Sequence, residues 1–278
     1  MTQPSNKEMK LTRPVQVAAL QLISSVGRTI ERVMRHDPTP PSMAGGPRIV
    51  RNGNPWLELP ARPPYVPPGD ASAVEGFNAR ARPDYRLQLD LLPEPFLGSP
   101  DAPVVLLNLN PGFAEGDRAA HADVGFRNAV LRTLRHEPQP FPFHYLDPTG
   151  TSLGHRWWRQ RLGRVLARVP AEHAASRLLC IEYFPYHSRK FAHGTLRLPS
   201  QAYGFELARQ AVVRAASVVL LRGERPWLEA VPELASHAKL FRLRSRQNVT
   251  LSPRNCPGGF ERVIEALAVH VQSGAVQQ

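Results

Sequence analysis

Four short apolar runs constrain the fold of this chain more than any other feature of its sequence. They stand at Val104–Asn108, Leu178–Tyr183 and Val218–Leu221, with a weaker fourth at Leu240–Leu243. Continuous hydrophobicity over so few residues, in place of apolar–polar alternation, is typical of strands buried on both faces of a parallel sheet. The runs therefore predict four strands in the part of the chain after residue 100.

Segments with a helical spacing of apolar residues lie between and after these runs. They cover about residues 125–135, 154–167, 201–215 and 259–271. Strands that alternate with helices form parallel sheets with helices on both faces. We therefore predict an α/β fold of three layers, α/β/α, around a central four-stranded, mostly parallel sheet. Ligands of such sheets bind beyond the carboxyl ends of the strands, so the residues after each strand are the candidates for a functional site.

The segment before the strands is rich in proline. Residues 38–100 hold fourteen of the 29 prolines, and proline lacks an N–H group and restricts the residue before it. We expect extended chain and turns here, without a long helix or a central strand. The apolar residues Trp56, Leu57, Leu59 and Tyr65 favour a strap packed on the domain over a loose linker.

Helical spacing precedes the proline-rich segment, from about Thr12 to His36. Its apolar stripe is expected to pack against a core or to dock on a partner. The chain therefore divides, by prediction, into a helical extension over residues 1–37, a strap or linker over residues 38–100 and an α/β domain over residues 101–278.

The basic charge is large for a chain of this length. Lysine and arginine number 35 against 23 acidic residues, which gives a formal net charge of +12. This excess favours a polyanionic partner, either nucleic acid or an anionic membrane surface, although a basic surface that serves only solubility is the alternative.

Two cysteines, Cys180 and Cys256, are too few for a disulfide scaffold, a four-cysteine zinc site or a four-cysteine iron–sulfur cluster. Apolar runs stay below the roughly 18 residues of a membrane span, and the first ten residues are polar, so neither a membrane partner nor secretion is indicated. We expect a soluble cytoplasmic protein.

Two asparagines follow the first predicted strand. Asn108 and Asn110 flank a tight turn that continues with Pro111 and Gly112. The amide of Asn110 offers an acceptor and a donor to a water molecule or a ligand. An ordinary turn without a function is the alternative interpretation.

A carboxylate, aromatic rings and basic side chains follow the second strand. Glu182 ends this strand, and because a buried carboxylate is costly unless paired, we expect it to form a salt bridge or to face a ligand. His187, Arg189 and Lys190 come shortly after it. Together with the neighbouring aromatic residues they suit base stacking and phosphate contacts, and a solvated charged turn is the alternative.

The fourth strand is followed by Ser252, Pro253, Arg254 and Asn255, which lead toward the last helix. A hydroxyl, backbone amides and an arginine at a helix start suit a phosphate backbone, although they also form ordinary capping loops. Another basic candidate is the helix over residues 154–167, in which arginines surround two tryptophans. It is either a surface helix anchored by tryptophan or a contact to a DNA strand.

These segments resemble two motifs of the uracil-DNA glycosylase superfamily. The first motif is Gly-x-Asn-Pro-Gly, which the residues from Asn108 to Gly112 resemble. The second is His-x-Ser-Pro, continued in the single-strand-selective branch by Arg-Asn, and the residues from Ser252 to Asn255 resemble it. The resemblance covers roughly residues 100–272. It implies a uracil-DNA glycosylase-like fold, DNA as the partner, and no metal or other cofactor.

The resemblance also implies roles for individual residues. Members of this family flip a nucleotide out of the duplex and hydrolyse its N-glycosidic bond with water. Asn110 would then position the attacking water, and Phe113, with Phe126 as the second choice, would stack on the base. The residues from Ser252 to Asn255 would hold the phosphates and wedge into the base stack.

Three positions depart from the family's pattern. Asn108 stands where the family has a glycine close to the base, and Glu182 stands where an asparagine recognises uracil. Thr250 stands where a histidine supports charge on the uracil carbonyl, a role for which His187 is a conceivable replacement. A carboxylate repels O4 of uracil but accepts a hydrogen bond from the 4-amino group of cytosine.

We therefore expect a monomeric, monofunctional DNA glycosylase that releases a modified pyrimidine and leaves an abasic site. The expected base is a 5-substituted cytosine, such as the hydroxymethyl or glucosylated form found in phage DNA, which in a bacterium would serve antiviral defence. The alternatives are a uracil-DNA glycosylase of base-excision repair, a non-catalytic DNA-binding module on the same fold, and an enzyme that acts on free nucleosides.

Overall fold

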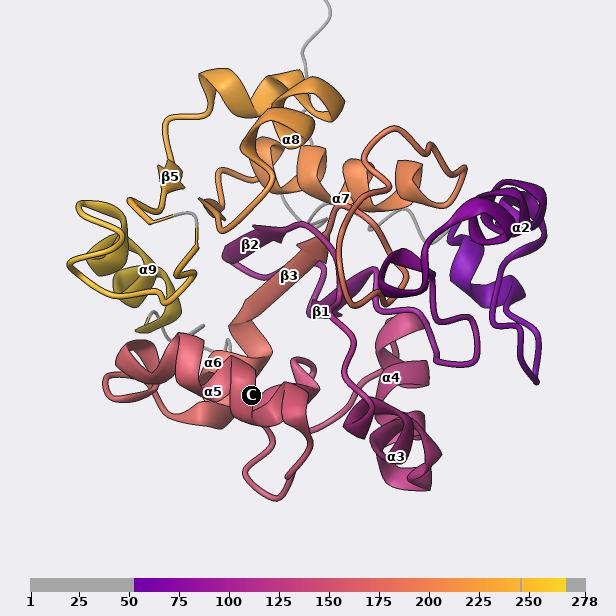
Figure 1. Ribbon diagram of the computed structural model, residues 1–278. Coiled ribbons are helices and arrows are strands. Elements are labelled where there is room, and N and C mark those ends of the chain that lie inside the picture. Colours follow the sequence, from indigo (N-terminus) through magenta and orange to yellow (C-terminus); the bar gives the residue numbers. More distant parts are fainter. Residues whose placement is uncertain (1–52, 246, 269–278) are drawn as a thin grey trace, which may run out of the picture. The chain divides into compact units, whose positions relative to one another are not determined.

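A computed structural model describes residues 53–245 and 247–268 of the chain, and a five-stranded sheet lies at the centre of this part (Figure 1). The strand order is β1-β3-β2-β4-β5. The strands are β1 (Phe96–Gly98), β2 (Val104–Asn108), β3 (Leu178–Glu182), β4 (Ser217–Leu220) and β5 (Leu240–Arg242). The last four strands pair in parallel, and β1 pairs antiparallel with β3. The α/β class and the four predicted strands are therefore confirmed.

The strand β1 corrects the prediction, because the sheet is mixed and has five strands in place of four. The three residues of β1 lie in the proline-rich segment, directly after Pro95. An edge strand tolerates neighbouring prolines because only one of its sides must form ladder hydrogen bonds. At Gly98, whose φ is +101°, a side chain would meet the carbonyl oxygen of Leu178, so the close approach of β1 to β3 needs glycine.

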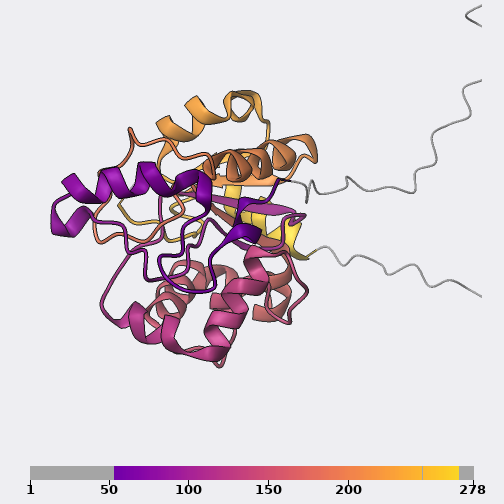
Figure 2. The same cartoon turned by 90° about the vertical axis from the view of Figure 1, so that its right-hand side faces the viewer.

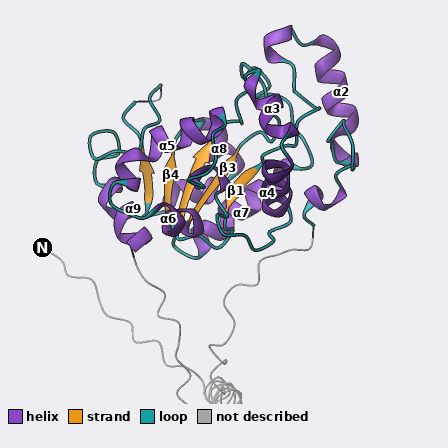
Figure 3. Cartoon of the chain, turned by 90° about the horizontal axis from the view of Figure 1, so that it is seen from below, coloured by secondary structure: helices purple, strands orange, loops and turns teal. Residues whose placement is uncertain are grey.

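Helices pack against both faces of the sheet. Val105 and Leu107 of β2 share one apolar cluster with α4, α7 and α8, whereas Val104 and Leu106 share a second cluster with α5, α6 and α9. Figures 1 and 2 show α7 and α8 on one side of the strands and α5 and α6 on the other, and Figure 3 shows the strands side by side among the helices. The continuous hydrophobicity of the strands follows from this burial on both faces.

Seven helices follow β2 in the described part of the chain: α3 (Gly116–Ala122), α4 (Val124–Leu134), α5 (Leu153–Leu166), α6 (Ala171–Arg177), α7 (Gln201–Val213), α8 (Glu224–Ala230) and α9 (Gly259–Ala268). The four helical patterns of the sequence are confirmed by α4, α5, α7 and α9. The predicted end of the pattern over residues 259–271 falls outside the described residues. The side chains of Asp123 and Ser152 cap α4 and α5 by accepting hydrogen bonds from backbone N–H groups. The helices α3, α6 and α8 have seven residues each, too few for a clear periodicity.

The described part of the proline-rich segment packs into the same core as the sheet. Trp56 and Tyr65 are 2% and 3% exposed and belong to the cluster that contains Val105, whereas Leu57 is 57% exposed. Asp70 is fully buried and accepts a hydrogen bond of 2.8 Å from the hydroxyl of Tyr186. These contacts attach the segment to the loop that follows β3.

The helix α2 (Ala71–Arg80) is a second correction in this segment, where extended chain and turns were predicted. It forms because residues 69–82 contain no proline, so every N–H group needed for a short helix is present. Turns of 3-10 helix begin at Pro55, Pro68 and Pro83, as expected where proline fixes φ at a first helical position. The helix predicted over residues 12–36 lies outside the described residues, and the division of the chain into three parts stays a prediction.

Within the residues that the structure describes, no helix is both long enough and apolar enough to cross a membrane.

Replacing Trp56 by alanine should destabilise the whole domain, because the indole lies in the common core. We expect a loss of about 3–5 kcal/mol in the free energy of unfolding, measured by denaturant titration. The matched control is Leu57→Ala, which removes an exposed neighbour and should cost no more than about 0.5 kcal/mol. Equal effects of the two substitutions would show that the segment is not part of the core.

Candidate functional site

Asn108 and Glu182 form a buried pair at the carboxyl ends of β2 and β3. The parallel register places them directly opposite each other, and the Nδ2 group of Asn108 donates a hydrogen bond of 3.0 Å to Oε1 of Glu182. The two residues are 4% and 6% exposed. Their other oxygens, Oδ1 of Asn108 and Oε2 of Glu182, are buried without a partner. The structure therefore brings two predicted base-binding residues together and leaves one oxygen of each without a hydrogen-bond partner.

Glu182 holds a proton at neutral pH. Burial raises the pKa of its carboxyl group to about 8, and the negative charge of Glu94 adds to the effect, whereas Asn108 and Arg222 oppose it. A protonated carboxyl group donates one hydrogen bond and accepts others. At neutral pH the pair therefore offers a donor on Glu182 and an acceptor, Oδ1, on Asn108.

The side chain of Asn110 is held in one orientation by two hydrogen bonds that its amide group donates. Its Nδ2 group donates to the carbonyl oxygen of Pro111 at 2.9 Å and to the hydroxyl of Ser188 at 3.0 Å. Both hydrogens of the amide are used in this way, so the side chain keeps only its carbonyl oxygen, Oδ1, for a water molecule or a ligand. The sequence left both the donor and the acceptor open, and the structure selects the acceptor.

The loop that carries Asn110 is joined to the loop after β3. Gly112 and Ser188 form a parallel backbone bridge, and Nδ1 of His187 donates a hydrogen bond of 2.8 Å to the carbonyl oxygen of Gly112. His187 is only 3% exposed. This ring therefore lies behind the loop and supports it, and its other nitrogen, Nε2, is buried without a partner.

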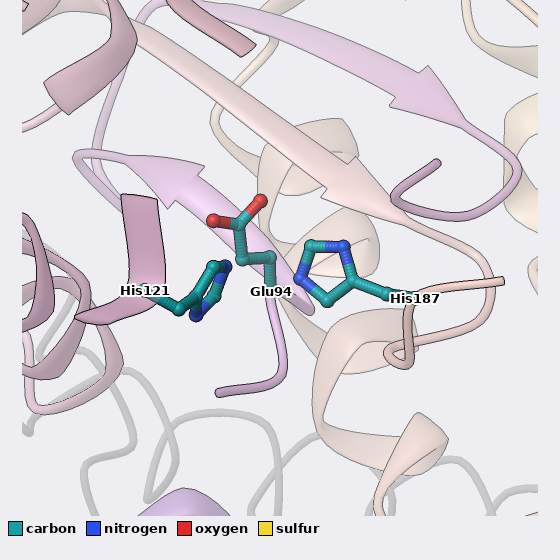
Figure 4. A group of neighbouring side chains, drawn as sticks. All are labelled: Glu94, His121 and His187. Atoms are coloured by element: carbon teal, nitrogen blue, oxygen red, sulfur yellow. The ribbon is translucent and has the colours of Figure 1, made fainter. Parts of the chain in front are cut away.

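A cluster of Glu94, His121 and His187 lies behind this loop (Figure 4). One ligand atom of each residue lies within 4.8 Å of the others. The hydroxyl of Tyr145 donates to the Glu94 carboxylate at 2.8 Å, and Nε2 of His144 lies 3.8 Å from it. Although burial favours the neutral acid, His144 and then His187 lower the pKa of Glu94 to about 2. The cluster is therefore built around a buried negative charge.

The two histidines of the cluster differ in their fitness as metal ligands. His187 donates through Nδ1, so its Nε2 atom carries the free lone pair that a metal requires. His121 accepts a hydrogen bond of 3.3 Å from the backbone N–H of Leu92 at Nδ1, which places its proton on Nε2. Burial, followed by the charge of His187, lowers the pKa of His121 to about 3, so this ring is neutral. A metal would have to displace either the hydrogen bond from Leu92 or the Nε2 proton, so a hydrogen-bonded cluster fits these residues better.

The two candidate stacking rings lie in different surroundings. Phe113 is half-buried, and the guanidinium groups of Arg118 and Arg189 lie 5.1 and 5.5 Å from its ring centre. Phe126 packs edge-on against His121 and lies 5.8 Å from the ring of Tyr145. Phe126 therefore covers the Glu94 cluster, whereas Phe113 lies on the turn that follows Asn110.

Arg189 and Lys190 are exposed, but carboxylates already lie beside them. The guanidinium of Arg189 lies 3.0 Å from Glu115, and the ammonium of Lys190 lies 2.7 Å from Asp84. Both residues therefore face solvent, which a contact to phosphate requires. Part of their positive charge is balanced by Glu115 and Asp84.

The loop after β5 is shaped by Asn255. Its Nδ2 group donates to the carbonyl oxygens of Asn248 and Thr250, and its Oδ1 accepts from the backbone N–H of Ser245. The hydroxyl of Ser252 accepts a hydrogen bond of 3.3 Å from the backbone N–H of Asn255. These two predicted phosphate contacts therefore hold the loop, and they leave Pro253 and Arg254 exposed on it.

Thr250 is half-buried and takes part in two polar contacts. Its hydroxyl donates a hydrogen bond of 2.7 Å to Oδ1 of Asn248 and lies 3.5 Å from a terminal nitrogen of Arg161. A guanidinium from α5 therefore lies close to the Thr250 hydroxyl.

A cavity of about 850 Å³ opens beyond the carboxyl ends of β2, β4 and β5. Its lining includes Leu109, Leu221, Arg222, Arg242 and Leu243. In the strand order, β2 is followed by β3 on one of its sides, whereas β4 is followed by β5 in the opposite direction. The cavity therefore lies at the point where the strand order reverses, which is where open α/β sheets bind ligands. It adjoins the predicted site through Leu109, the residue between the two asparagines.

Comparison with protein-family models, with curated proteins and with solved structures gives no match for this chain. The geometry of the site and the two motifs therefore carry the functional argument.

The site also contains Ser188, Glu94, His121 and Arg222, which the sequence reasoning missed, whereas Arg161 lies on the helix that it named as a candidate DNA contact. Ser188 directly follows a predicted residue, and its position after a strand could have marked it. The others reach the site from elements far away in the sequence, and no local pattern indicates which of their atoms face it.

Glu182→Gln tests the proton on Glu182 through the pH dependence of stability. The folded pKa of about 8 lies above the ordinary value of 4.5, so the folded protein keeps a proton that the unfolded chain releases in this range. The contribution of Glu182 is therefore complete below about pH 4.5 and is lost as the pH rises through 8. Urea titrations from pH 5 to pH 9 should show wild type losing stability relative to Glu182→Gln.

The control for this measurement is Glu172→Gln, which changes an exposed carboxylate on α6. Its stability should follow that of wild type across the pH range. A constant difference between wild type and Glu182→Gln from pH 5 to pH 9 would contradict the proton assigned to Glu182.

Proposed function

We propose that this protein hydrolyses the N-glycosidic bond of a modified pyrimidine in DNA and leaves an abasic site. The observation that carries the proposal is the orientation of Asn110, whose amide hydrogens are bound by Pro111 and Ser188 and whose Oδ1 is left to accept from water. The Asn108–Glu182 pair lies two residues before it along the loop and at the end of the neighbouring strand. A water site and a base-recognition pair therefore share one edge of the sheet.

The fold supports the same proposal. Helices on both faces of the strands β3-β2-β4-β5 correspond to the three-layer α/β/α arrangement that the resemblance to uracil-DNA glycosylases implies. The two motifs lie after β2 and after β5, at carboxyl ends of parallel strands. The basic excess of the chain suits DNA as the partner.

The reaction needs orientation more than a strong base. The oxygen of the bound water attacks the anomeric carbon, the carbon–nitrogen bond breaks, and its electron pair leaves with the base. Asn110 cannot take a full proton from water, so Oδ1 orients the water while the bond to the base breaks and positive charge develops on the sugar. The water proton passes to solvent or to the released base, and an abasic deoxyribose remains.

The Asn108–Glu182 pair suits the edge of cytosine. In the protonated form, Oε2–H of Glu182 donates to N3 of cytosine and Oδ1 of Asn108 accepts from the 4-amino group. We therefore keep a 5-substituted cytosine, hydroxymethylated or glucosylated as in phage DNA, as the proposed base, with antiviral defence as its biological role.

Uracil is the second candidate base, and the raised pKa of Glu182 is the observation that favours it. A protonated carboxyl group donates to O4 of uracil, whereas a carboxylate repels it. Release of uracil should therefore fall as the pH rises above about 8, because the carboxylate then repels O4. Release of a cytosine derivative should fall less steeply, because its 4-amino group still donates to Oδ1 of Asn108 when the bond from Glu182 to N3 is lost.

The test is a screen of the purified protein on DNA that contains uracil, 5-methylcytosine, hydroxymethylcytosine or glucosylated hydroxymethylcytosine. Abasic sites are detected as strand breaks after alkali. We expect Asn110→Ala to lower the rate on the preferred base by at least about 100-fold, because the water loses its orienting group. Ser188→Ala should lower kcat by about 10-fold and leave KM unchanged, because it only frees the amide of Asn110 to rotate.

The matched control is Asn128→Ala, which changes an exposed asparagine on α4 and should retain full activity. Wild-type protein that binds these DNAs but makes no abasic sites on any of them would favour a non-catalytic DNA-binding module. Equal rates for wild type and Asn110→Ala would remove the role proposed for this residue.

A further inference from the structure

Two arginines approach the site without a carboxylate bound to either of them. Arg161, on α5, lies 3.5 Å from the hydroxyl of Thr250, and its Nε atom is buried without a partner. Arg222 follows β4 and lines the cavity. Its backbone N–H donates to the carbonyl oxygen of Leu107, and within the described part of the chain its guanidinium group has neither a hydrogen bond nor an ion pair. Both guanidinium groups therefore keep donors that the protein does not use.

The two charges are close enough to repel each other. Burial lowers the pKa of Arg222, Glu182 opposes this shift, and the positive charge of Arg161 adds a smaller lowering effect. An anion that binds near both guanidinium groups is attracted by both positive charges.

Other arginines on the same cavity wall are already paired. Arg225 lies 2.7 Å from Glu229, and Arg242 lies 2.5 Å from Glu224. Arg222 thus differs from its neighbours on this wall in having its guanidinium free for a ligand.

Arg161 is held in place by its surroundings. Its carbonyl oxygen accepts a hydrogen bond of 2.9 Å from the backbone N–H of Leu251, and its guanidinium lies 5.3 Å from the ring centre of Trp157. The aromatic ring and the loop after β5 therefore orient this side chain before any ligand arrives.

We propose that Arg161 and Arg222 form a binding site for a phosphate group of a nucleic-acid strand that enters the cavity at the switch point of the sheet. Guanidinium forks match phosphate oxygens in geometry and charge. The apolar walls formed by Leu109, Leu221 and Leu243 accept the faces of bases or sugars beside that phosphate. The choice of DNA as the strand rests on the proposed function, whereas binding of the phosphate needs no hydrolysis.

The experiment measures binding of a fluorescent single-stranded DNA of unmodified bases at several salt concentrations. Arg161→Gln and Arg222→Gln should each lower the affinity about 5-fold to 10-fold and reduce the slope of log affinity against log salt by about one. The matched control is Arg164→Gln on the exposed face of α5, which should stay within about 2-fold of wild type. Arg161→Lys keeps the charge and should restore part of the affinity, which separates loss of charge from loss of folding.

A second arm uses inorganic phosphate and measures the melting temperature. If phosphate stabilises wild type but not the double variant Arg161→Gln/Arg222→Gln, the site binds a free phosphate group. If only DNA binding is lost in the double variant, the site binds phosphate as part of a strand. Both outcomes support the site, and an affinity and salt slope unchanged in the double variant would overturn it.

The same DNA-binding measurement in an Asn110→Ala background separates this site from the proposed hydrolysis. In that background the two arginine substitutions should lower the affinity by the same factor as they do in the wild-type protein. A protein that makes no abasic sites but shows this loss has the phosphate site without the proposed activity.

Discussion

The parallel register between β2 and β3 is the constraint on which the rest of the site depends. It places Asn108 opposite Glu182 and ends both strands at the same level, so the loops that follow run side by side. The bridge between Gly112 and Ser188 continues this pairing beyond the sheet, and the hydrogen bond from Asn110 to Ser188 uses it. A shift of the register by one residue would turn these side chains to the other face and separate the two loops.

Two buried carboxyl groups on this scaffold are kept in opposite states by their surroundings. Tyr145 and three histidines surround Glu94, whose pKa stays at about 2, whereas burial raises the pKa of Glu182 to about 8. The charge on Glu94 helps to keep Glu182 protonated. Pairs of carboxyl groups whose pKa values are driven apart in this way are a common basis for assigning separate roles in a site. Here the charged member is surrounded by Tyr145 and the histidines, and the neutral member pairs with Asn108 at the edge of the sheet.

The sequence predicts the central strands, the long helices and the edge of the sheet that carries the site, because burial and periodicity leave local patterns in the chain. Asn108, Asn110 and Glu182 could be assigned to that edge for the same reason. The strand β1 and the helix α2 could not be predicted, because each is short and lies among prolines whose effect depends on neighbouring elements. Ser188, Arg161 and Arg222 act through contacts between distant elements, and the proton on Glu182 depends on the burial that those elements create. The roles of these residues therefore emerge only once the fold is assembled.

The central claim is that water held by Asn110 releases a base from DNA, and its most direct test is isotopic. DNA carrying the preferred base is incubated with the protein in water enriched in oxygen-18, and the products are analysed by mass spectrometry. The account predicts a free base and one oxygen-18 atom in the abasic deoxyribose, with neither product formed by Asn110→Ala. Intact DNA after incubation with wild type on every tested base, or a free base together with a sugar that lacks the label, would contradict it.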